Sequence, residues 1–173
     1  MPEQDHVLSI IVENQPGVLA RISGLFSGRG FNIESLCVAL SAEEGLSCIT
    51  LVTRAEDMVL EQIKKQLNKL IGVVKVMDYS SSPAVFRELA LVKVRAKPDN
   101  RAEILRISDI FKCKVLDVGP EHYTLEVTGS REKIAALLEL LKPMGIREVA
   151  RTGITALSRE TKKNGKGRKN GTD

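Results

Sequence analysis

The chain has 173 residues, of which 43% are hydrophobic and 28% charged, a composition typical of a globular protein that folds in water. No apolar run approaches the length of a membrane span, and the first residues lack the pattern of a signal peptide. The three cysteines form no CxxC pair, so we expect neither a disulfide framework nor a zinc site. These features exclude membrane-spanning and disulfide-stabilised secreted proteins and predict a cytoplasmic location.

The net charge of +4 comes from one end of the chain. Residues 159–173 contain six basic and two acidic residues, which leaves 20 of each in the rest of the sequence. We expect this tail, rich in Lys, Gly and Asn, to be disordered and to keep the protein soluble rather than to bind RNA or an acidic partner. Because the remaining sequence is neutral, it predicts no basic groove for nucleic acid.

The first half of the sequence predicts the order strand, helix, strand, strand, helix, strand. Apolar residues recur at helical spacing after Gly17 and again after Asp57, and they alternate along the intervening segments. Gly30 and Gly72 end the two helices. The predicted strands are Val7–Glu13, Asn32–Leu40, Leu46–Thr53 and Val73–Tyr79.

The same order repeats after a segment rich in serine that ends at Pro83. One helix is predicted from Arg101 to Phe111, and Ser130 begins a second. The predicted strands are Glu88–Ala96, Lys114–Val118, Tyr123–Thr128 and Ile146–Thr152.

The predicted fold class is therefore α+β, with two ferredoxin-like βαββαβ domains whose antiparallel sheets have their helices on one face. The first domain is expected over residues 1–80, a linker over 81–87, the second domain over 88–158 and the basic tail over 159–173. Such a sheet leaves one face and at least one edge uncovered, and a unit of this size has a small core. We therefore expect a homodimer or a larger oligomer.

The candidate binding site is the connection between the first strand and the first helix. Pro16 suits the first turn of a helix, and Gly17 lacks a Cβ, so a ligand can approach its backbone closely. Free N–H groups at a helix start have a partial positive charge, which favours a carboxylate or a phosphate. The alternative is an ordinary strand–turn–helix connection in which an asparagine only caps the helix. The candidate ligand groups are the backbone N–H groups of Gly17, Val18 and Leu19 and the side chains of Asn14 and Asn32.

No catalytic or metal site is predicted. His6 and His122 lie in different halves of the chain, and we expect both to be exposed to solvent without a role. The sequence lacks the GxxxxGK[ST] motif that binds nucleotide phosphates, and no histidine is placed to activate a cysteine.

Three classes of function remain at this stage. The first is a module that senses a small ligand at the glycine loop. The second is an RNA-binding protein, because RRM domains share the βαββαβ order, but the chain has few aromatic residues for base stacking. The third is a small enzyme with a site shared between subunits, which the lack of a catalytic pair disfavours.

The segment ENQPGVLARISGLFSGRGFNIESLCV resembles the opening of the small regulatory subunit of acetolactate synthase (acetohydroxyacid synthase). In that family this segment is part of the ACT domain, a βαββαβ module that binds amino acids, so the resemblance implies an ACT domain here. The resemblance continues through VLEQIKKQLNKLIGVVKV, RELALVKVRA and REVARTGITALSRE, and it covers roughly Val7 to Glu160.

The resemblance implies a non-catalytic subunit that activates a large subunit and makes it sensitive to feedback inhibition by a branched-chain amino acid, usually valine. Thiamine diphosphate, magnesium and FAD are expected in the large subunit and not in this chain. A stand-alone ACT sensor for another enzyme is the alternative. The family's effector site lies between two ACT domains, and the second-half loop Lys97–Asn100, which lacks glycine, is expected to form none. By motif match, the effector residues are Asn14, Gly17, Val18 and Leu19 of one subunit and Asn32 and Ile33 of the other.

Overall fold

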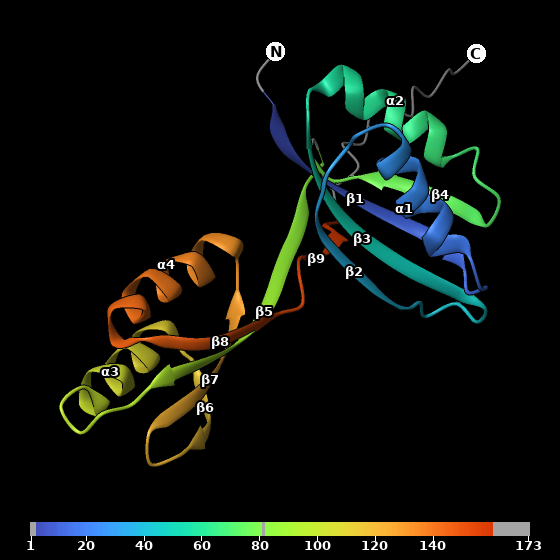
Figure 1. Ribbon diagram of the computed structural model, residues 1–173. Coiled ribbons are helices and arrows are strands. Elements are labelled where there is room, and N and C mark those ends of the chain that lie inside the picture. Colours follow the sequence, from blue (N-terminus) through green and yellow to red (C-terminus); the bar gives the residue numbers. More distant parts are fainter. Residues whose placement is uncertain (1–2, 81, 161–173) are drawn as a thin grey trace, which may run out of the picture.

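The computed structural model describes residues 3–80 and 82–160, which form two βαββαβ units connected by one long strand (Figure 1). Both units are α+β with antiparallel sheets, and each packs its two helices against one face of its sheet, which confirms the predicted fold class. Most of the predicted basic tail, residues 161–173, lies outside the described residues.

The first unit contains four strands and two helices in the predicted order: β1 (Gln4–Glu13), α1 (Val18–Gly28), β2 (Ile33–Leu40), β3 (Leu46–Ala55), α2 (Asp57–Leu67) and β4 (Val73–Asp78). The strand order in the sheet is β2-β3-β1-β4, so β2 and β4 form its edges. Alternate residues of the central strands, such as Leu8 and Leu51, face the helices and are fully buried. Ile22 and Phe26, four residues apart on α1, complete this core from the other side.

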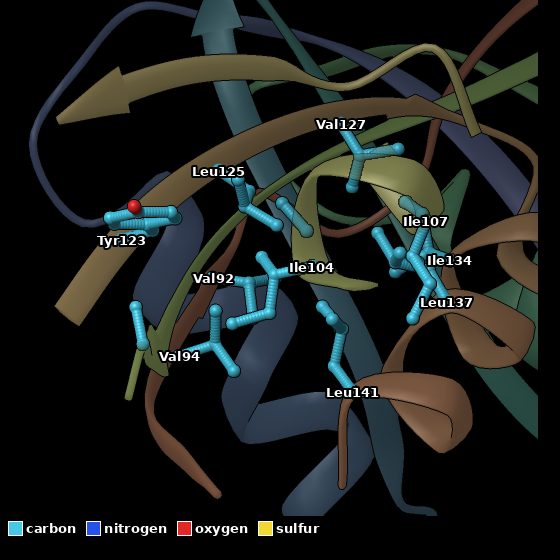
Figure 2. Close-up of a cluster of buried hydrophobic side chains, with 12 residues drawn as sticks. Val92, Val94, Ile104, Ile107, Tyr123, Leu125, Val127, Ile134, Leu137 and Leu141 are labelled. Carbon is cyan, nitrogen blue, oxygen red and sulfur yellow. The ribbon is translucent and has the colours of Figure 1, made fainter. Parts of the chain in front are cut away.

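The second unit repeats this order and adds a short strand at its end: β5 (Ala84–Arg95), α3 (Arg101–Phe111), β6 (Lys114–Val118), β7 (His122–Gly129), α4 (Arg131–Leu141), a 3₁₀ turn (Lys142–Met144), β8 (Ile146–Arg151) and β9 (Thr155–Ser158). Figure 2 shows its core, where Val92 and Leu125 of the central strands β5 and β7 gather with Ile104 of α3 and Leu137 of α4. These side chains are fully buried, so the second unit has a hydrophobic core of its own.

The boundary between the units differs from the prediction. Residues 84–87, expected within the linker, are the first part of β5 and pair with β9, a strand that we did not predict. The register places Val85 opposite Leu157 and Arg87 opposite Thr155. These partners are about 70 residues apart in sequence, so local patterns could not reveal the pairing.

The two-stranded ribbon of β9 and the start of β5 covers part of the first sheet. A hollow of about 240 Å³ is lined by Cys37 and Thr50 from the sheet and by Val85 and Ala156 from the ribbon. Thr50 is 4% exposed although it points away from the helices. The face that we expected to be bare is therefore covered in part by the same chain.

Candidate functional site

The glycine loop between β1 and α1 is held by two neighbouring turns. The backbone N–H of Glu13 donates to the carbonyl of Gly72 at 2.8 Å, and that of Asn14 donates to the carbonyl of Gly45 at 2.8 Å. The helix begins after Gly17, whose φ of +88° is a left-handed conformation that favours glycine. Because Gly17 is the N-cap and no side chain caps the helix there, the alternative in which Asn14 caps the helix is wrong.

The predicted ligand-binding residues of the loop differ in how far they are exposed to solvent. Asn14 and Gly17 are exposed, and Leu19 is 41% exposed on the first turn of α1. The Val18 side chain is 3% exposed and packs into the core, so only its backbone is available to a ligand. Its N–H lies 3.5 Å from the carbonyl of Gln15, a long hydrogen bond within the loop.

Arg21 adds a positive charge that our sequence analysis missed. Its Nη1 donates to the carbonyl of Ile71 at 2.9 Å, which fixes the guanidinium beside the loop. A Cβ added at Gly17 would lie 3.6 Å from Nη2 of the same side chain, so the guanidinium and the glycine are neighbours. The signal was present in the sequence, because Arg21 follows Gly17 by four residues and thus lies on the same helical face.

Asn32 and Ile33 lie at the other end of the sheet. In the strand registers, Ile33 pairs with Thr53, and Thr53 also pairs with His6 near the start of β1. Asn14 follows the end of β1, so the two asparagines are separated by about eight residues of strand, or roughly 26 Å. Within one chain the structure therefore does not bring the two groups of predicted effector residues together.

The surroundings of Asn32 are open and charged. Its side-chain amide donates to Oε1 of Glu34 at 2.7 Å, and its carbonyl accepts a hydrogen bond from the Thr53 hydroxyl at 2.7 Å. Asn32 lines a hollow of about 590 Å³ together with Arg29 and Arg54, among other residues. This hollow has room for a small polar ligand or for a loop of another subunit.

His6 is a structural residue, which corrects our expectation that it is exposed. It is fully buried because β1 begins at Gln4, three residues before the predicted start. Its Nε2 donates to the carbonyl of Ala55 at 3.0 Å, and its Nδ1 lies 3.0 Å from the hydroxyl of Ser80. Both ring nitrogens therefore have hydrogen-bond partners within the chain. His122 is half-buried on β7 and is not fully exposed either.

The corresponding loop of the second unit is occupied by its own chain. The Arg101 side chain donates from Nε to the carbonyl of Ala96 at 3.1 Å and from Nη2 to the carbonyl of Pro120. The guanidinium therefore bridges the two segments beside this loop, which supports the prediction that no second effector site forms there. That prediction remains to be tested.

Residues 3–80 and 82–160 contain neither a membrane-spanning helix nor a cluster of metal ligands. None of their helices is long and apolar enough to cross a membrane. They contain no group of three or more His, Cys, Asp or Glu side chains placed to hold a metal ion.

Comparison with protein families matches each unit to a family model of its own. Residues 8–75 match the family described as "AHAS small subunit-like ACT domain", and residues 87–160 match "Small subunit of acetolactate synthase".

Individual proteins give the same result over nearly the whole chain. The acetolactate synthase small subunit of Mycolicibacterium smegmatis is 51% identical over 154 residues, which cover 89% of this chain and 91% of that protein. The acetolactate synthase small subunit of Aquifex aeolicus is 51% identical over 90% of this chain and 81% of its own length. The crystal structure of the acetolactate synthase small subunit from Thermotoga maritima is 40% identical and superposes with a TM-score of 0.85, covering 91% of this chain and 99% of that one.

Proposed function

Because the chain belongs to the family of acetolactate synthase small subunits, we propose that it regulates a catalytic large subunit. In this role it activates the large subunit and makes it sensitive to feedback inhibition by a branched-chain amino acid, with valine as the expected effector. The chemistry belongs to the large subunit, which would hold thiamine diphosphate, magnesium and FAD. This chain contributes the ligand sensor.

The observation that supports this proposal most is the placement of two half-sites at opposite ends of the first sheet. One half-site is the glycine loop, which follows the interior strand β1, and the other is Asn32 with Ile33 at the start of the edge strand β2. β1 and β2 both run antiparallel to β3, so they run parallel to each other. The glycine loop therefore lies at the end where β2 finishes, and Asn32 lies at the end where β2 begins. A two-fold axis that pairs β2 with β2 of a second copy in antiparallel fashion would bring the glycine loop of one copy to Asn32 of the other.

The exposed side chains at this edge support the same arrangement. Val38 is 45% exposed and Leu40 75% exposed on β2, and the backbone groups on the outer side of this edge strand are available for pairing. Pairing of two copies would bury both apolar side chains and extend the sheet across the dimer. An unprotected apolar edge of this kind is uncommon in a protein that functions as a monomer.

The chemistry of the two half-sites suits an amino acid. The start of α1 and the guanidinium of Arg21 would attract the carboxylate of the ligand. Asn14 and Asn32 would hydrogen-bond the ammonium group and the remaining carboxylate oxygen. Leu19 and Ile33 offer apolar surface for a branched side chain of the size of valine.

Two measurements test the proposal. Calorimetric titration of the full chain with valine, leucine and isoleucine should give heat of binding with at least one of them. Acetolactate formation by the catalytic large subunit should rise when the chain is added and fall again with that amino acid. If no branched-chain amino acid binds and salt-sensitive binding to RNA is found instead, the RNA-binding alternative holds and the proposal is wrong.

A further inference from the structure

The edge strand β2 makes a contact with the second unit very close to the proposed effector residues. Asn32 and Ile33 lie at the start of this strand. Two residues later, the hydroxyl oxygen of Ser35 accepts a hydrogen bond from the backbone N–H of Ile154 at 3.3 Å. Ile33 is therefore only two residues away from a contact between the two units.

Gly153 packs against the same hydroxyl group. Its φ is +77°, and a Cβ at this position would lie 2.3 Å from Oγ and 3.6 Å from Cβ of Ser35. Both the backbone conformation and the available space therefore require glycine here. The Ser35 hydroxyl therefore occupies the space where a side chain of residue 153 would begin, directly beside its hydrogen bond with Ile154.

Gly153 and Ile154 form the corner at which the chain leaves the second sheet. Thr152, before the corner, is still bound to that sheet, because its N–H donates to the carbonyl of Leu89 at 3.0 Å. Thr155, after the corner, pairs with Arg87 in the ribbon that covers the first sheet. Ser35 thus contacts the point where the chain passes from the second unit to the first.

β2 is irregular at the residue between the effector residues and Ser35. Ile33 pairs with Thr53 and Ser35 with Val52, so Glu34 is an extra residue that forms a β-bulge. The carboxylate of Glu34 accepts the hydrogen bond from the Asn32 amide. A ligand that engages Asn32 competes with Glu34 for this amide and thereby acts on the bulge that orients Ser35.

The junction also has space for a rearrangement. A hollow of about 280 Å³ separates Ser35 and Leu36 from Arg151 on the second unit. An ion pair between Arg131 and Asp5, 2.6 Å long, also connects the units, but both side chains are almost half exposed, which makes it a weak restraint.

We infer that Ser35 and Gly153 are positioning residues that transmit occupancy of the effector site from β2 to the second unit. The inference rests on the proposed function. Neither Ser35 nor Gly153 is expected to contact the ligand. Loss of the Ser35 hydroxyl should therefore leave effector binding intact and weaken the inhibition that follows from it. The free energy that couples two sites can change while the affinity of each site, measured without the other partner, stays the same.

The test uses the full chain carrying Ser35→Ala, with and without the catalytic large subunit. In the wild type, valine should change amide hydrogen exchange at residues 153–158 and inhibit the holoenzyme. In Ser35→Ala, the calorimetric Kd for valine of the chain alone should stay within about threefold, and activation without valine should be unchanged. The exchange response at 153–158 should disappear, and the valine concentration for half inhibition should rise at least tenfold.

Two further variants make the result decisive. Gly153→Ala attacks the same contact from the second unit and should reproduce the loss of inhibition with retained valine binding. Ser41→Ala is the control, because Ser41 follows the other end of β2 and its hydroxyl accepts a local hydrogen bond from the N–H of Glu43, two residues later. Normal valine inhibition in Ser35→Ala would overturn the inference and leave the proposed function intact. Failure of the wild type to bind any branched-chain amino acid would overturn both.

Discussion

Arg151 binds Glu88 with two hydrogen bonds between neighbouring strands, Nε to Oε1 at 2.6 Å and Nη2 to Oε2 at 2.8 Å. The Glu88 side chain is 4% exposed and that of Arg151 is 37% exposed, so the carboxylate depends on this partner for its hydrogen bonds. Hydrogen bonding to Glu88 outweighs burial and raises the pKa of Arg151. A charge-assisted pair of this geometry is among the stronger polar interactions in proteins.

Arg151→Met should therefore lower the free energy of unfolding by about 2–3 kcal/mol, because it leaves a buried carboxylate without its donor. Replacing both partners, as Glu88→Gln with Arg151→Met, should recover part of this loss. Lys93→Met is the matched control, since Lys93 pairs with Glu148 between the same two strands at 3.2 Å but on an exposed surface. Lys93→Met should lower the free energy of unfolding, measured with urea, by less than about 0.5 kcal/mol. Equal losses in the two single variants would contradict this expectation.

The stability of the first unit should fall in acid because of Asp78. Its carboxylate accepts hydrogen bonds from the backbone N–H of Ser80 at 2.8 Å and from Nζ of Lys64 at 3.1 Å. Burial alone would raise the pKa of Asp78, but these hydrogen bonds lower it from its usual value of 3.8. The unfolded chain therefore binds the proton at higher pH, so the stabilisation is complete above 3.8 and is lost as the pH falls through the lowered folded value.

The free energies of unfolding of the wild-type protein and of Asp78→Asn should accordingly differ by about 1 kcal/mol near neutral pH. The two values should converge in acid. Thermal unfolding between pH 6 and pH 2, monitored by circular dichroism, measures this difference. Asp99→Asn, in an exposed turn, is the control and should follow the wild type. A gap that stays constant over this range would show that the charge of Asp78 contributes nothing.

Much of the fold follows from patterns that are local in sequence. The spacing of Leu60, Ile63 and Leu67 places them on one face of α2, and all three are buried as a helix of that period requires. The strand and helix order of both units could be read in the same way. The pairing of β9 with the start of β5 could not, because it joins residues 84–87 to residues 155–158, about 70 residues apart, and four residues are too few to show a period.

The candidate site could be predicted in its residue types but not in its geometry. The glycine loop was visible, because Pro16 and Gly17 interrupt a strand and precede a helix. The hydrogen bond that holds the Arg21 side chain beside Gly17 is made with the carbonyl of Ile71, which is distant in sequence. The burial of His6 likewise depends on partners in β3 and after β4.

Gly17→Asp should abolish inhibition by valine while activation of the large subunit persists. The substitution places a carboxylate where we expect the carboxylate of the ligand, beside Arg21. Since Gly17 has a φ of +88°, the backbone cost is about 1–2 kcal/mol. Enzyme assays at saturating valine measure the effect. Gly28→Asp is the control, because a Cβ at this helical glycine meets nothing within 4 Å. A wild-type response to valine in Gly17→Asp would show that the site is misplaced.

The separation of Asn14 and Asn32 leads to a test of how the effector site is assembled. Asn14→Ala and Asn32→Ala should each weaken valine binding by about ten- to hundred-fold, because each removes a hydrogen bond to a charged group worth roughly 1.5–3 kcal/mol. The melting temperature without valine should change little, since both side chains are exposed. Calorimetry and inhibition curves should shift by similar factors, because binding and inhibition are linked.

Mixed oligomers of the two variants then distinguish a shared site from a site within one chain. In a two-fold dimer with one copy of each variant, one site receives both substitutions and the other receives neither. Co-expression with two affinity tags, followed by purification through both, isolates this mixed species. It should bind valine at half the wild-type stoichiometry with wild-type affinity. If each site were built within a single chain, the mixed species would contain no intact site, and wild-type affinity would not return.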